Sequence, residues 1–539
     1  MSATETVLDI SGLTVRLPAH ADRAHAIEDV SLTVRRGEIV CIVGESGSGK
    51  SVTAFSIMGL LPKGELAPVA GEIRLDGEDV LKATPARLRR LRGARMAMIF
   101  QEPMTALNPV ETIGEQVDEV LRIHTELKDR ERKAKVIEIL TAMRLPDPQR
   151  LYDAYPHQIS GGQRQRIMIA AAMVLDPHLL IADEPTTALD VTTQAQILAL
   201  IKDLQRRHDT GVLFITHDFG VVADIAHRVV VMQRGRVVEE GPAEEVLKHP
   251  RHDYTRMLIA AIPSLDPKPL DPKTGPITLE TVKLGKSYGG GLWRKDRVVA
   301  AAQDVNLQVR RGETLGIVGE SGSGKTTVAR CVARLIAPST GAIRVNDIDI
   351  APLRERQLRP YRRRVQVVFQ DPYRSLNPRR TVAASIVEGP MNFGLAEGEA
   401  LRRARSLLAL VGLSPDVLDR YPHQFSGGQR QRIAIARALA MEPEILIADE
   451  AVSALDVSVQ AQVLELLDDV KRRFDLAVLF ITHDLRVAAQ ICDRIIVMEK
   501  GIVVEEGATH RVYTAPQHPY TRALLEAAPG RNFAFGKAV

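Results

Sequence analysis

The sequence contains one pattern twice. The heptapeptide GESGSGK occurs at 44–50 and again at 319–325, and further motifs follow each copy in the same order. From YPHQ at 155–158 and 421–424 onward, the paired motifs stay 266 residues apart. In a chain of 539 residues, this repetition predicts two tandem copies of one domain, each long enough to bury its own core.

A proline-rich segment separates the two copies. Five prolines fall within residues 263–276, which is typical of a stiff, extended linker. We therefore expect a first domain at 1–263, a linker at 264–276 and a second domain at 277–539.

Charge and cysteine content exclude several classes of protein. Lys and Arg number 71 and Asp and Glu 67, so the net charge of +4 gives little support to a dedicated nucleic-acid binder. Cys41, Cys331 and Cys492 lie far apart, so we expect buried thiols and neither a disulfide framework nor an iron–sulfur cluster. No secretory signal pattern is visible at the N-terminus, and no apolar run reaches about 18 residues, so we do not expect the chain to span a membrane.

Each copy alternates short apolar runs with helical patterns, which predicts an α/β fold. Continuous apolar runs of this length indicate strands that are covered on both faces. The segment 192–208 has helical apolar spacing, and the stretch between 101 and 160 carries helical patterns at 115–124 and 131–145, which suggests a helical insertion. In the first copy the predicted strands lie at 39–44, 96–100, 179–183, 212–216 and 227–232.

The repeated heptapeptide begins a phosphate-binding pattern, GxxxxGK[ST], directly after a predicted strand. Its glycines let backbone N–H groups curl around phosphate oxygens, and the following helix N-terminus favours negative charge. Lys50 and Lys325 are expected to reach the β- and γ-phosphates, while Ser51 and Thr326 offer a hydroxyl to Mg²⁺. The expected nucleotide-binding residues are Gly44, Glu45, Ser46, Gly47, Ser48, Gly49, Lys50 and Ser51, and Gly319, Glu320, Ser321, Gly322, Ser323, Gly324, Lys325 and Thr326.

An acidic pair follows a later strand in each copy, in LLIADEP (179–185) and ILIADEA (445–451). Asp183 and Asp449 suit a Mg²⁺-holding role. Glu184 and Glu450 are placed to orient or activate an attacking water. Together with the phosphate loop, the pair predicts nucleotide hydrolysis.

With SGGQ at 160–163 and 426–429 added to these motifs, each copy resembles the ATP-binding cassette (ABC) ATPases. The motif order also agrees: phosphate loop, glutamine loop, signature, acidic pair, ALD loop and switch histidine. The resemblance implies P-loop NTPase domains, each a RecA-like α/β core with an inserted helical subdomain. It also implies an intramolecular dimer of cassettes that binds ATP and Mg²⁺.

The same resemblance implies further site residues. ATP at 44–51 would face Ser426, Gly427, Gly428 and Gln429, and ATP at 319–326 would face Ser160, Gly161, Gly162 and Gln163. Gln101 and Gln370 would sense Mg²⁺ and the attacking water, His217 and His483 would contact the γ-phosphate, and Asp190 and Asp456 would cross the dimer interface.

Softer motifs narrow the resemblance to the peptide/nickel importer branch. These are QDPYRSLNP and the tails HDYTRMLIAAIP (252–263) and HPYTRALLEAAP (518–529). The likeness implies the energy-coupling ATPase of an importer for peptides or peptide-like solutes, peripheral on the cytoplasmic face of the bacterial inner membrane. Its implied partners are two transmembrane permeases and, through them, a solute-binding protein.

Other functions remain open at this point. One alternative is a soluble twin-cassette ATPase acting on ribosomes or nucleic acid, although the short proline-rich linker and the few cysteines speak against its known forms. Export in place of import is another. Peptide, glutathione, nickel and a peptide-like antibiotic all remain possible cargo.

Two positions differ between the copies in a way that bears on the sites. Tyr288 stands where an adenine-stacking aromatic residue is expected in the second copy, whereas the first copy has Leu17. We therefore expect weaker nucleotide affinity at the first site. Ala451 replaces Pro185 after the acidic pair, but because both glutamates are present we expect hydrolysis at both sites.

Overall fold

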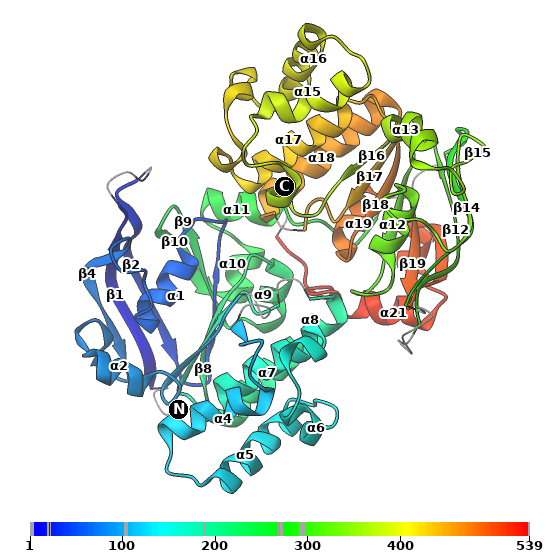
Figure 1. The fold of residues 1–539 in the computed structure, drawn as a ribbon. Coiled ribbons are helices and arrows are strands. Elements are labelled where there is room, and N and C mark those ends of the chain that lie inside the picture. Colours follow the sequence, from blue (N-terminus) through cyan, green and yellow to red (C-terminus); the bar gives the residue numbers. More distant parts are fainter. Residues whose placement is uncertain are drawn as a thin grey trace. The chain divides into compact units, whose positions relative to one another are not determined.

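The computed structural model describes residues 5–18, 21, 23–101, 106–186, 189–267, 269, 273–289, 298–453 and 455–536. The chain divides into two compact units, which Figure 1 colours by sequence. The first unit comprises Met1–Ile262 together with Pro529–Val539, and the second comprises Pro263–Ala528. Residues 268 and 270–272 of the expected linker lie outside the described part.

The first unit contains an antiparallel sheet and a largely parallel one. The antiparallel sheet has the order β2-β1-β4-β5, and the other has the order β10-β9-β3-β8-β7-β6, in which only β10 runs antiparallel to its neighbour. All five strands expected from apolar runs are present, with ends shifted by one residue at most. The strands are β1 (Thr6–Arg16), β2 (His25–Arg35), β3 (Ile39–Val43), β4 (Ala67–Leu75), β5 (Glu78–Asp79), β6 (Met96–Ile99), β7 (Leu179–Asp183), β8 (Gly211–Ile215), β9 (Arg228–Gln233) and β10 (Arg236–Pro242).

The second unit repeats both sheets. Their orders are β12-β11-β14-β15 and β16-β17-β18-β13-β19-β20, which match the first unit strand for strand. These strands are β11 (Ile277–Tyr288), β12 (Val299–Arg310), β13 (Thr314–Val318), β14 (Thr340–Val345), β15 (Ile348–Asp349), β16 (Val365–Val368), β17 (Ile445–Asp449), β18 (Ala477–Ile481), β19 (Arg494–Glu499) and β20 (Ile502–Ala508).

The central strands are apolar throughout because both of their faces are covered. Every residue of β3 is buried. Ile39, Cys41 and Val43 belong to the core on the helical side of the sheet, whereas Val40 and Ile42 belong to the core shared with the antiparallel sheet. A strand in this position has no polar face, which is why its sequence does not alternate.

A helical region interrupts each α/β core between the glutamine and the signature, as the sequence predicts. In Figure 1 the helices α4, α5 and α6 group around α7, and α15 and α16 group around α17. α4 begins with a capping box between Thr112 and Glu115 and buries Ile113, Val117 and Leu121 along one face. The helices are α4 (Ile113–His124), α5 (Asp129–Ala142), α6 (Pro148–Tyr152) and α7 (Gly161–Met173), then α14 (Pro372–Ser375), α15 (Val382–Asn392), α16 (Glu397–Leu410) and α17 (Gly427–Leu439).

The remaining helices flank the sheets. They are α1 (Lys50–Met58), α2 (Pro85–Leu91), α8 (Val191–His208), α9 (Phe219–Ile225), α10 (Ala243–Lys248) and α11 (Asp253–Ala260) in the first unit. Their counterparts are α12 (Lys325–Val332), α13 (Glu355–Arg364), α18 (Val457–Phe474), α19 (Leu485–Ile491), α20 (Thr509–Thr514) and α21 (Pro519–Glu526). Short 3₁₀ turns lie at Val80–Lys82, Pro156–Gln158, Pro415–Asp419 and Pro422–Gln424. Within the described residues, no helix has the length and apolarity needed to cross a membrane.

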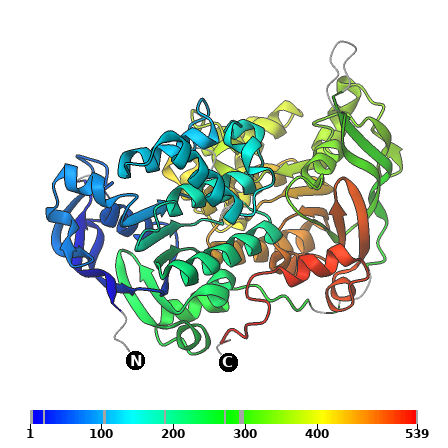
Figure 2. The ribbon, with the colours of Figure 1, turned by 90° about the horizontal axis from the view of Figure 1, so that it is seen from below.

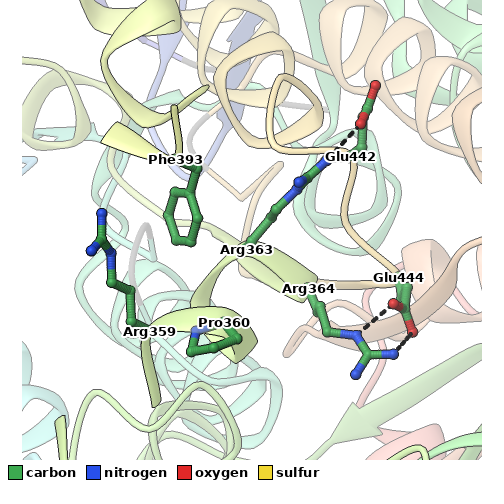
Figure 3. Close-up of a pocket in the computed structure, with 7 residues that line it drawn as sticks. All are labelled: Arg359, Pro360, Arg363, Arg364, Phe393, Glu442 and Glu444. Atoms are coloured by element: carbon green, nitrogen blue, oxygen red, sulfur yellow. Dashed lines mark hydrogen bonds and ion pairs between the residues drawn. The ribbon is translucent and has the colours of Figure 1, made fainter. Parts of the chain in front are cut away.

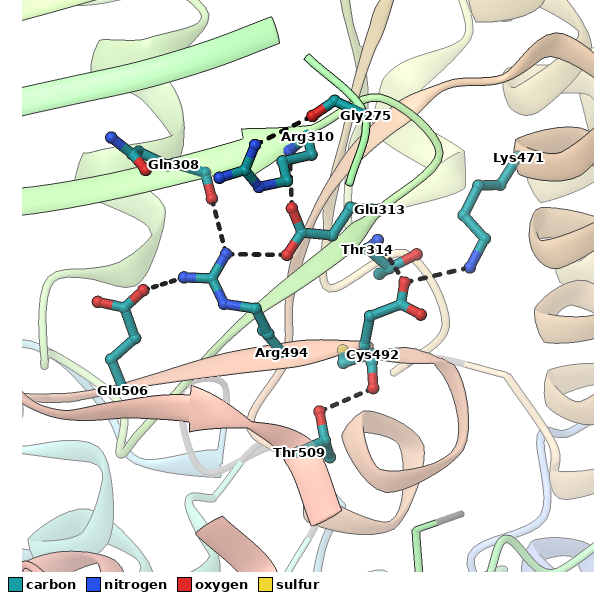
Figure 4. Close-up of polar contacts among 11 residues, drawn as sticks. Gly275, Gln308, Arg310, Glu313, Thr314, Lys471, Cys492, Arg494, Glu506 and Thr509 are labelled. Carbon is teal, nitrogen blue, oxygen red and sulfur yellow. Dashed lines mark hydrogen bonds and ion pairs between the residues drawn. The ribbon is translucent and has the colours of Figure 1, made fainter. Parts of the chain in front are cut away.

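A charge pair lies at the amino end of the central strand in each unit, and Figure 4 shows the pair of the second unit. Glu313, directly before β13, is 1% exposed and lies 2.9 Å from Arg494 of β19, which also contacts Glu506. Glu38 and Arg228 form the same 2.9 Å pair in the first unit. A buried acid without its partner destabilises a fold by several kcal/mol, so the contact with Arg494 stabilises Glu313 at this edge. In open α/β sheets, ligands bind at the opposite, carboxyl edge.

All three cysteines are buried free thiols, as expected from the sequence. Burial raises the pKa of all three thiols, to about 11 for Cys331. Each is therefore an inert core side chain.

The end of the chain packs against the first unit, where Figure 2 shows it in red beside green elements. The amide of Gly530 donates to the Asp224 carboxylate at 3.0 Å, and that of Gly536 donates to the Leu247 carbonyl at 3.0 Å. Phe533 and Phe535 are partly buried against the first unit's core. The last described residues thus complete a core that the first repeat begins.

Candidate active sites

Each phosphate loop joins the central strand of its sheet to a helix. β3 ends at Val43 and α1 begins at Lys50, and β13 and α12 are connected in the same way. Gly44 has a φ of 148°, and a Cβ added there would lie 2.2 Å from the Met232 carbonyl oxygen. Gly47 has a φ of 77°, and its Cβ would meet nothing within 4 Å. Packing therefore requires the first glycine, while the second leaves open space where a phosphate can approach the backbone.

The loop lysines are buried and held by carbonyl oxygens. Lys50 Nζ donates to Gly44 at 2.6 Å and to Glu45 at 3.0 Å, and Lys325 makes the matching pair of bonds at 2.7 Å each. The two lysines are 6% and 4% exposed. An ammonium group held in this way lies inside the loop, where phosphate oxygens can replace the carbonyls as partners.

A hydroxyl and a carboxylate meet beside each loop. Ser51 Oγ donates to Asp183 Oδ1 at 3.3 Å, and Thr326 Oγ1 donates to Asp449 Oδ1 at the same distance. Burial, with the charge of Glu184 adding to it, raises the pKa of Asp183 to about 6 despite the opposing effects of Ser51 and Lys50. Burial likewise raises the pKa of Asp449. A divalent cation would stabilise these carboxylates as anions, and Mg²⁺ prefers few protein oxygens together with phosphate and water, so the donor set fits that ion.

The two glutamates expected to be catalytic stand at a strained turn at the ends of β7 and β17. Glu184 has a φ of 47° and Glu450 a φ of 49°, a left-handed conformation that non-glycine residues adopt only at a cost. Their amides donate to the carbonyls of Ile215 and Ile481, both at 2.9 Å. The neighbouring strand thus holds each strained turn in place.

In the first unit, a glutamine and a histidine flank Glu184. Gln101 Nε2 donates to Glu184 Oε2 at 3.0 Å, and His217 Nδ1 lies 3.3 Å from Glu184 Oε1. His217 comes just before α9, which begins after the side-chain cap of Asp218. The three residues, from separate parts of the sequence, meet at one carboxylate.

The second unit has the same arrangement, with Gln370 at 2.7 Å and His483 at 3.4 Å from Glu450. Burial opposes ionisation of Glu450, but the hydrogen bond and charge of His483 and the charge of Lys325 outweigh it and lower its pKa. Burial also disfavours the charged imidazole, yet the hydrogen bond and charge of Glu450 raise the pKa of His483. Both shifts favour the ionised pair, and the Glu450 carboxylate can accept a hydrogen bond from water.

The signature segments begin the helices α7 and α17. Ser160 and Gln163 form a capping box, as do Ser426 and Gln429, so both glutamine side chains bond within their own helix. A Cβ on Gly162 would lie 2.8 Å from Thr193, while one on Gly161 would meet nothing within 4 Å. Only the second glycine is needed for packing against α8. The first glycine leaves the helix N-terminus accessible to an anion.

The two adenine positions differ in exposure. Tyr288, at the end of β11, is 45% exposed, and Lys286 Nζ lies 5.2 Å from the centre of its ring. Leu17 is instead partly buried against the core of the first unit. The aspartate of the ALD loop, Asp190, caps α8 by accepting the Thr193 amide at 2.9 Å.

Two tyrosines at the phosphate loops are not predicted as site residues from the sequence. The Tyr254 hydroxyl accepts the Glu45 amide at 3.1 Å, and the Tyr520 hydroxyl accepts the Glu320 amide at 3.0 Å. Each comes from the tail helix of its copy, α11 or α21. The available signal was their recurrence in HDYTR and HPYTR, but sequence does not reveal what they contact.

A cavity of about 710 Å³ in the second unit is lined by none of these groups. Figure 3 shows three arginines around it, of which Arg363 is paired with Glu442 at 2.9 Å and Arg364 with Glu444 at 2.6 Å. Arg359 donates to the Asn392 carbonyl. Each of the three arginines already has a partner, unlike a cationic side chain that is left to bind phosphate. We therefore interpret the cavity as a polar packing region beside α13 and not as a phosphate-binding site.

Two family models match the chain. The model described as ABC transporter matches residues 27–187 and 302–453, which is more than half of the sequence. A second model, described as the C-terminal region of oligopeptide/dipeptide transporters, matches residues 238–290 and 504–534. The second model covers both tail helices and their tyrosines.

Curated proteins resemble the chain over nearly its whole length. Glutathione import ATP-binding protein GsiA of Salmonella choleraesuis (strain SC-B67) is 47% identical, over 97% of this chain and 89% of its own. The protein of the same name from Escherichia coli (strain K12) is 46% identical with the same coverage. A solved dimeric post-hydrolysis state of the ATP-binding cassette MJ0796, bound to ADP and Pi, is 31% identical with a TM-score of 0.40, over 43% of this chain and 98% of that one. The resemblance seen in the motifs is confirmed: the chain belongs to the ABC transporter family, in its oligopeptide/dipeptide branch, and is an ATPase with two ATP-binding cassettes.

Proposed function

We propose that the chain is the energy-coupling subunit of an importer for peptides or peptide-like solutes. The match of residues 238–290 and 504–534 to the oligopeptide/dipeptide transporter model carries the proposal. The Gln–Glu–His arrangement beside a phosphate loop in both units supports the ATP hydrolysis that would supply the energy. Two relatives with nearly half of their residues identical are named for glutathione import. No observation on the described residues favours the ribosome or nucleic-acid alternative.

The importer role defines the proposed partners and location. Family membership implies permease subunits, and we propose two of them, with a solute-binding protein reached through them. The chain would lie peripherally on the cytoplasmic face of the inner membrane. The solute would pass through the permeases and not through this chain. We therefore take the solute class from the relatives alone, and propose peptide-like solutes.

Each ATP would be held by groups from both cassettes. In this proposal, the loop at 44–51 and Ser426–Gln429 bind one nucleotide, while the loop at 319–326 and Ser160–Gln163 bind the other. The support is chemical: Lys50 and Lys325 supply buried cations, and Gly161 leaves the N-terminus of α7 approachable. Tyr288 would stack on adenine at the second loop.

Hydrolysis would depend on the groups around each glutamate. Mg²⁺, when bound by Ser51 and Asp183 or by Thr326 and Asp449, supplies positive charge to the β- and γ-phosphates. Glu184 or Glu450 would accept the proton of the attacking water. Gln101 or Gln370 would orient that water, and His217 or His483 would contact the γ-phosphate. Closure of the cassettes on ATP and reopening after hydrolysis would drive the permeases.

A pull-down from gently solubilised membranes tests this function. The tagged chain with Glu184→Gln and Glu450→Gln is used, because a cassette that retains ATP holds its partners longer. We expect two polytopic permeases in the eluate, and the matched control with Lys50→Ala and Lys325→Ala should recover less of them with ATP. Ribosomal proteins or nucleic acid without a permease would contradict the proposal.

A further inference from the structure

The tail helices lie against the phosphate loops, far from them in sequence. Tyr254 is 6% exposed, and its hydroxyl is bonded twice to Glu45: it accepts the amide at 3.1 Å and donates to Oε2 at 3.2 Å. Glu45 directly follows Gly44, at the point where the loop leaves β3. One hydroxyl thus holds both the backbone and the side chain of the loop's second residue.

The tyrosine is itself held by a fixed local structure. His252 caps α11 by accepting the Tyr254 amide at 3.2 Å. Glu239 of β10 accepts the amides of Arg251 and His252 at 2.7 and 3.1 Å, which anchors the start of the helix to the sheet. The tyrosine hydroxyl is therefore presented to the loop from a rigid support.

The second unit repeats this support residue for residue. Tyr520 accepts the Glu320 amide at 3.0 Å, and His518 accepts the Tyr520 amide at 3.2 Å. Glu505 of β20 accepts the amides of Gln517 and His518 at 2.9 and 3.0 Å. Burial tends to raise the pKa of Glu505, but these amide hydrogen bonds lower it. The Glu505 carboxylate that anchors the helix is therefore an anion at neutral pH.

We propose that Tyr254 and Tyr520 are positioning residues that fix the start of each phosphate loop and thereby set the affinity of each site for ATP. The inference rests on the proposed nucleotide-binding function of the loops. A loop whose second residue is already bonded through its amide keeps its phosphate-binding shape without ligand, so ATP binding does not have to order it. Without the hydroxyl, the ligand must order the loop and binds more weakly.

The test removes the tyrosine hydroxyl and measures nucleotide affinity at one site at a time. Tyr520→Phe is made in the full chain with Lys50→Ala, so that the second loop binds the probe, a fluorescent N-methylanthraniloyl derivative of ATP with Mg²⁺. The matched control is Tyr513→Phe, in the same unit, because the Tyr513 hydroxyl donates to the Leu485 carbonyl at 2.6 Å and touches no phosphate loop. The melting temperature and the kcat of ATP hydrolysis are measured on the same samples.

We expect Tyr520→Phe to raise the dissociation constant about five-fold, the effect of one lost neutral hydrogen bond, with kcat changed less than about two-fold. Tyr513→Phe should lower the melting temperature and leave the affinity unchanged. Tyr254→Phe in a chain with Lys325→Ala should repeat the loss at the first loop.

Three results would overturn the inference. They are an unchanged affinity in Tyr520→Phe, an equal loss in Tyr513→Phe, or an effect at one loop only. Failure of the parental chains to bind the probe at all would instead overturn the proposed function, and this inference with it.

Discussion

In the first unit the Ser51 hydroxyl lies 3.3 Å from Oδ1 of Asp183, and in the second unit the Thr326 hydroxyl lies 3.3 Å from Oδ1 of Asp449. Glu184 and Glu450 each contact a glutamine, at 3.0 and 2.7 Å, and a histidine, at 3.3 and 3.4 Å. The sheet orders and the tail-helix tyrosines also recur, but other contacts differ between the two units. Contacts that both units share are the ones we expect ATP hydrolysis to require, whereas contacts found in one unit stabilise only that unit.

One difference between the units involves the signature helices α7 and α17. In the second unit Arg437 of α17 donates to the Ser375 carbonyl at 2.5 Å, and the Arg430 guanidinium carbon lies 3.8 Å from the centre of the Tyr373 ring. The first unit has Ala171 in place of Arg437. In the second unit, Arg437 and Arg430 thus connect the signature helix to the segment after Gln370. Ala171 has no guanidinium group with which to make the contact of Arg437.

The largest expected effect tests whether the repeated chemistry is used twice. Glu184→Gln and Glu450→Gln each replace the carboxylate proposed to activate water by an amide of similar shape, and loss of a general base costs about 10²–10⁴-fold in rate. We expect each single change to lower total ATP turnover at least by half and the double change to lower it about 10²-fold or more. Steady-state phosphate release measures this, and a single variant with full turnover would show that its site is idle.

A second test asks whether the end of the chain stabilises only the first unit. Ending the chain at Ala528 removes Phe533 and Phe535, and we expect the first unit to lose about 3 kcal/mol, because burying one phenylalanine fully is worth about that much and these two are partly buried. Amide exchange should accelerate in α9 and α10 and stay unchanged in α19 and α20.

Equal loss of protection in both units, or in neither, would contradict the assignment of the tail to the first unit.

A third test removes a difference between the units. Arg437→Ala gives the second unit the alanine that the first has, and we expect a loss of about 2 kcal/mol, the usual value for a hydrogen bond from a charged group. Chemical denaturation of the full chain, followed by exchange in α17, measures it. Exposed Arg405 on α16 is the matched control, with an expected change below about 0.5 kcal/mol on substitution by alanine. A cost at Arg437 no larger than at Arg405 would mean that the contact of Arg437 is not stabilising.

The smallest effect concerns adenine. Tyr288→Leu makes the second loop resemble the first, and the loss of stacking should weaken nucleotide binding there about five-fold. The converse change, Leu17→Tyr, should not restore affinity at the first loop, because Leu17 is partly buried against the core. Titration of chains with one phosphate-loop lysine replaced compares the two loops. Equal affinities in the unmodified loops would contradict the expected asymmetry.

The sequence was most informative where the relevant residues are neighbours along the chain. The phosphate loop and the acidic pair follow buried strands directly, so strand periodicity and motif together predict their place at the carboxyl edge of a sheet. The antiparallel strands β1, β2 and β4 carry no continuous apolar run, and none of them is predicted.

Contacts between distant residues were harder to infer. Gln101 and Glu184 are 83 residues apart, and only the family resemblance suggested a shared site. The contact of Tyr254 with Glu45 spans 209 residues and has no motif of its own. The packing of Phe533 and Phe535 on the first unit depends on where the chain turns after α21, which local sequence does not specify.

The central claim is that one chain carries two complete ATP sites built from repeated residues. The most direct test is the amount of nucleotide retained by the chain with Glu184→Gln and Glu450→Gln after incubation with Mg²⁺ and ATP and rapid removal of free ligand. Two ATP molecules per chain are predicted, both unhydrolysed. One ATP per chain, or none, would contradict the account.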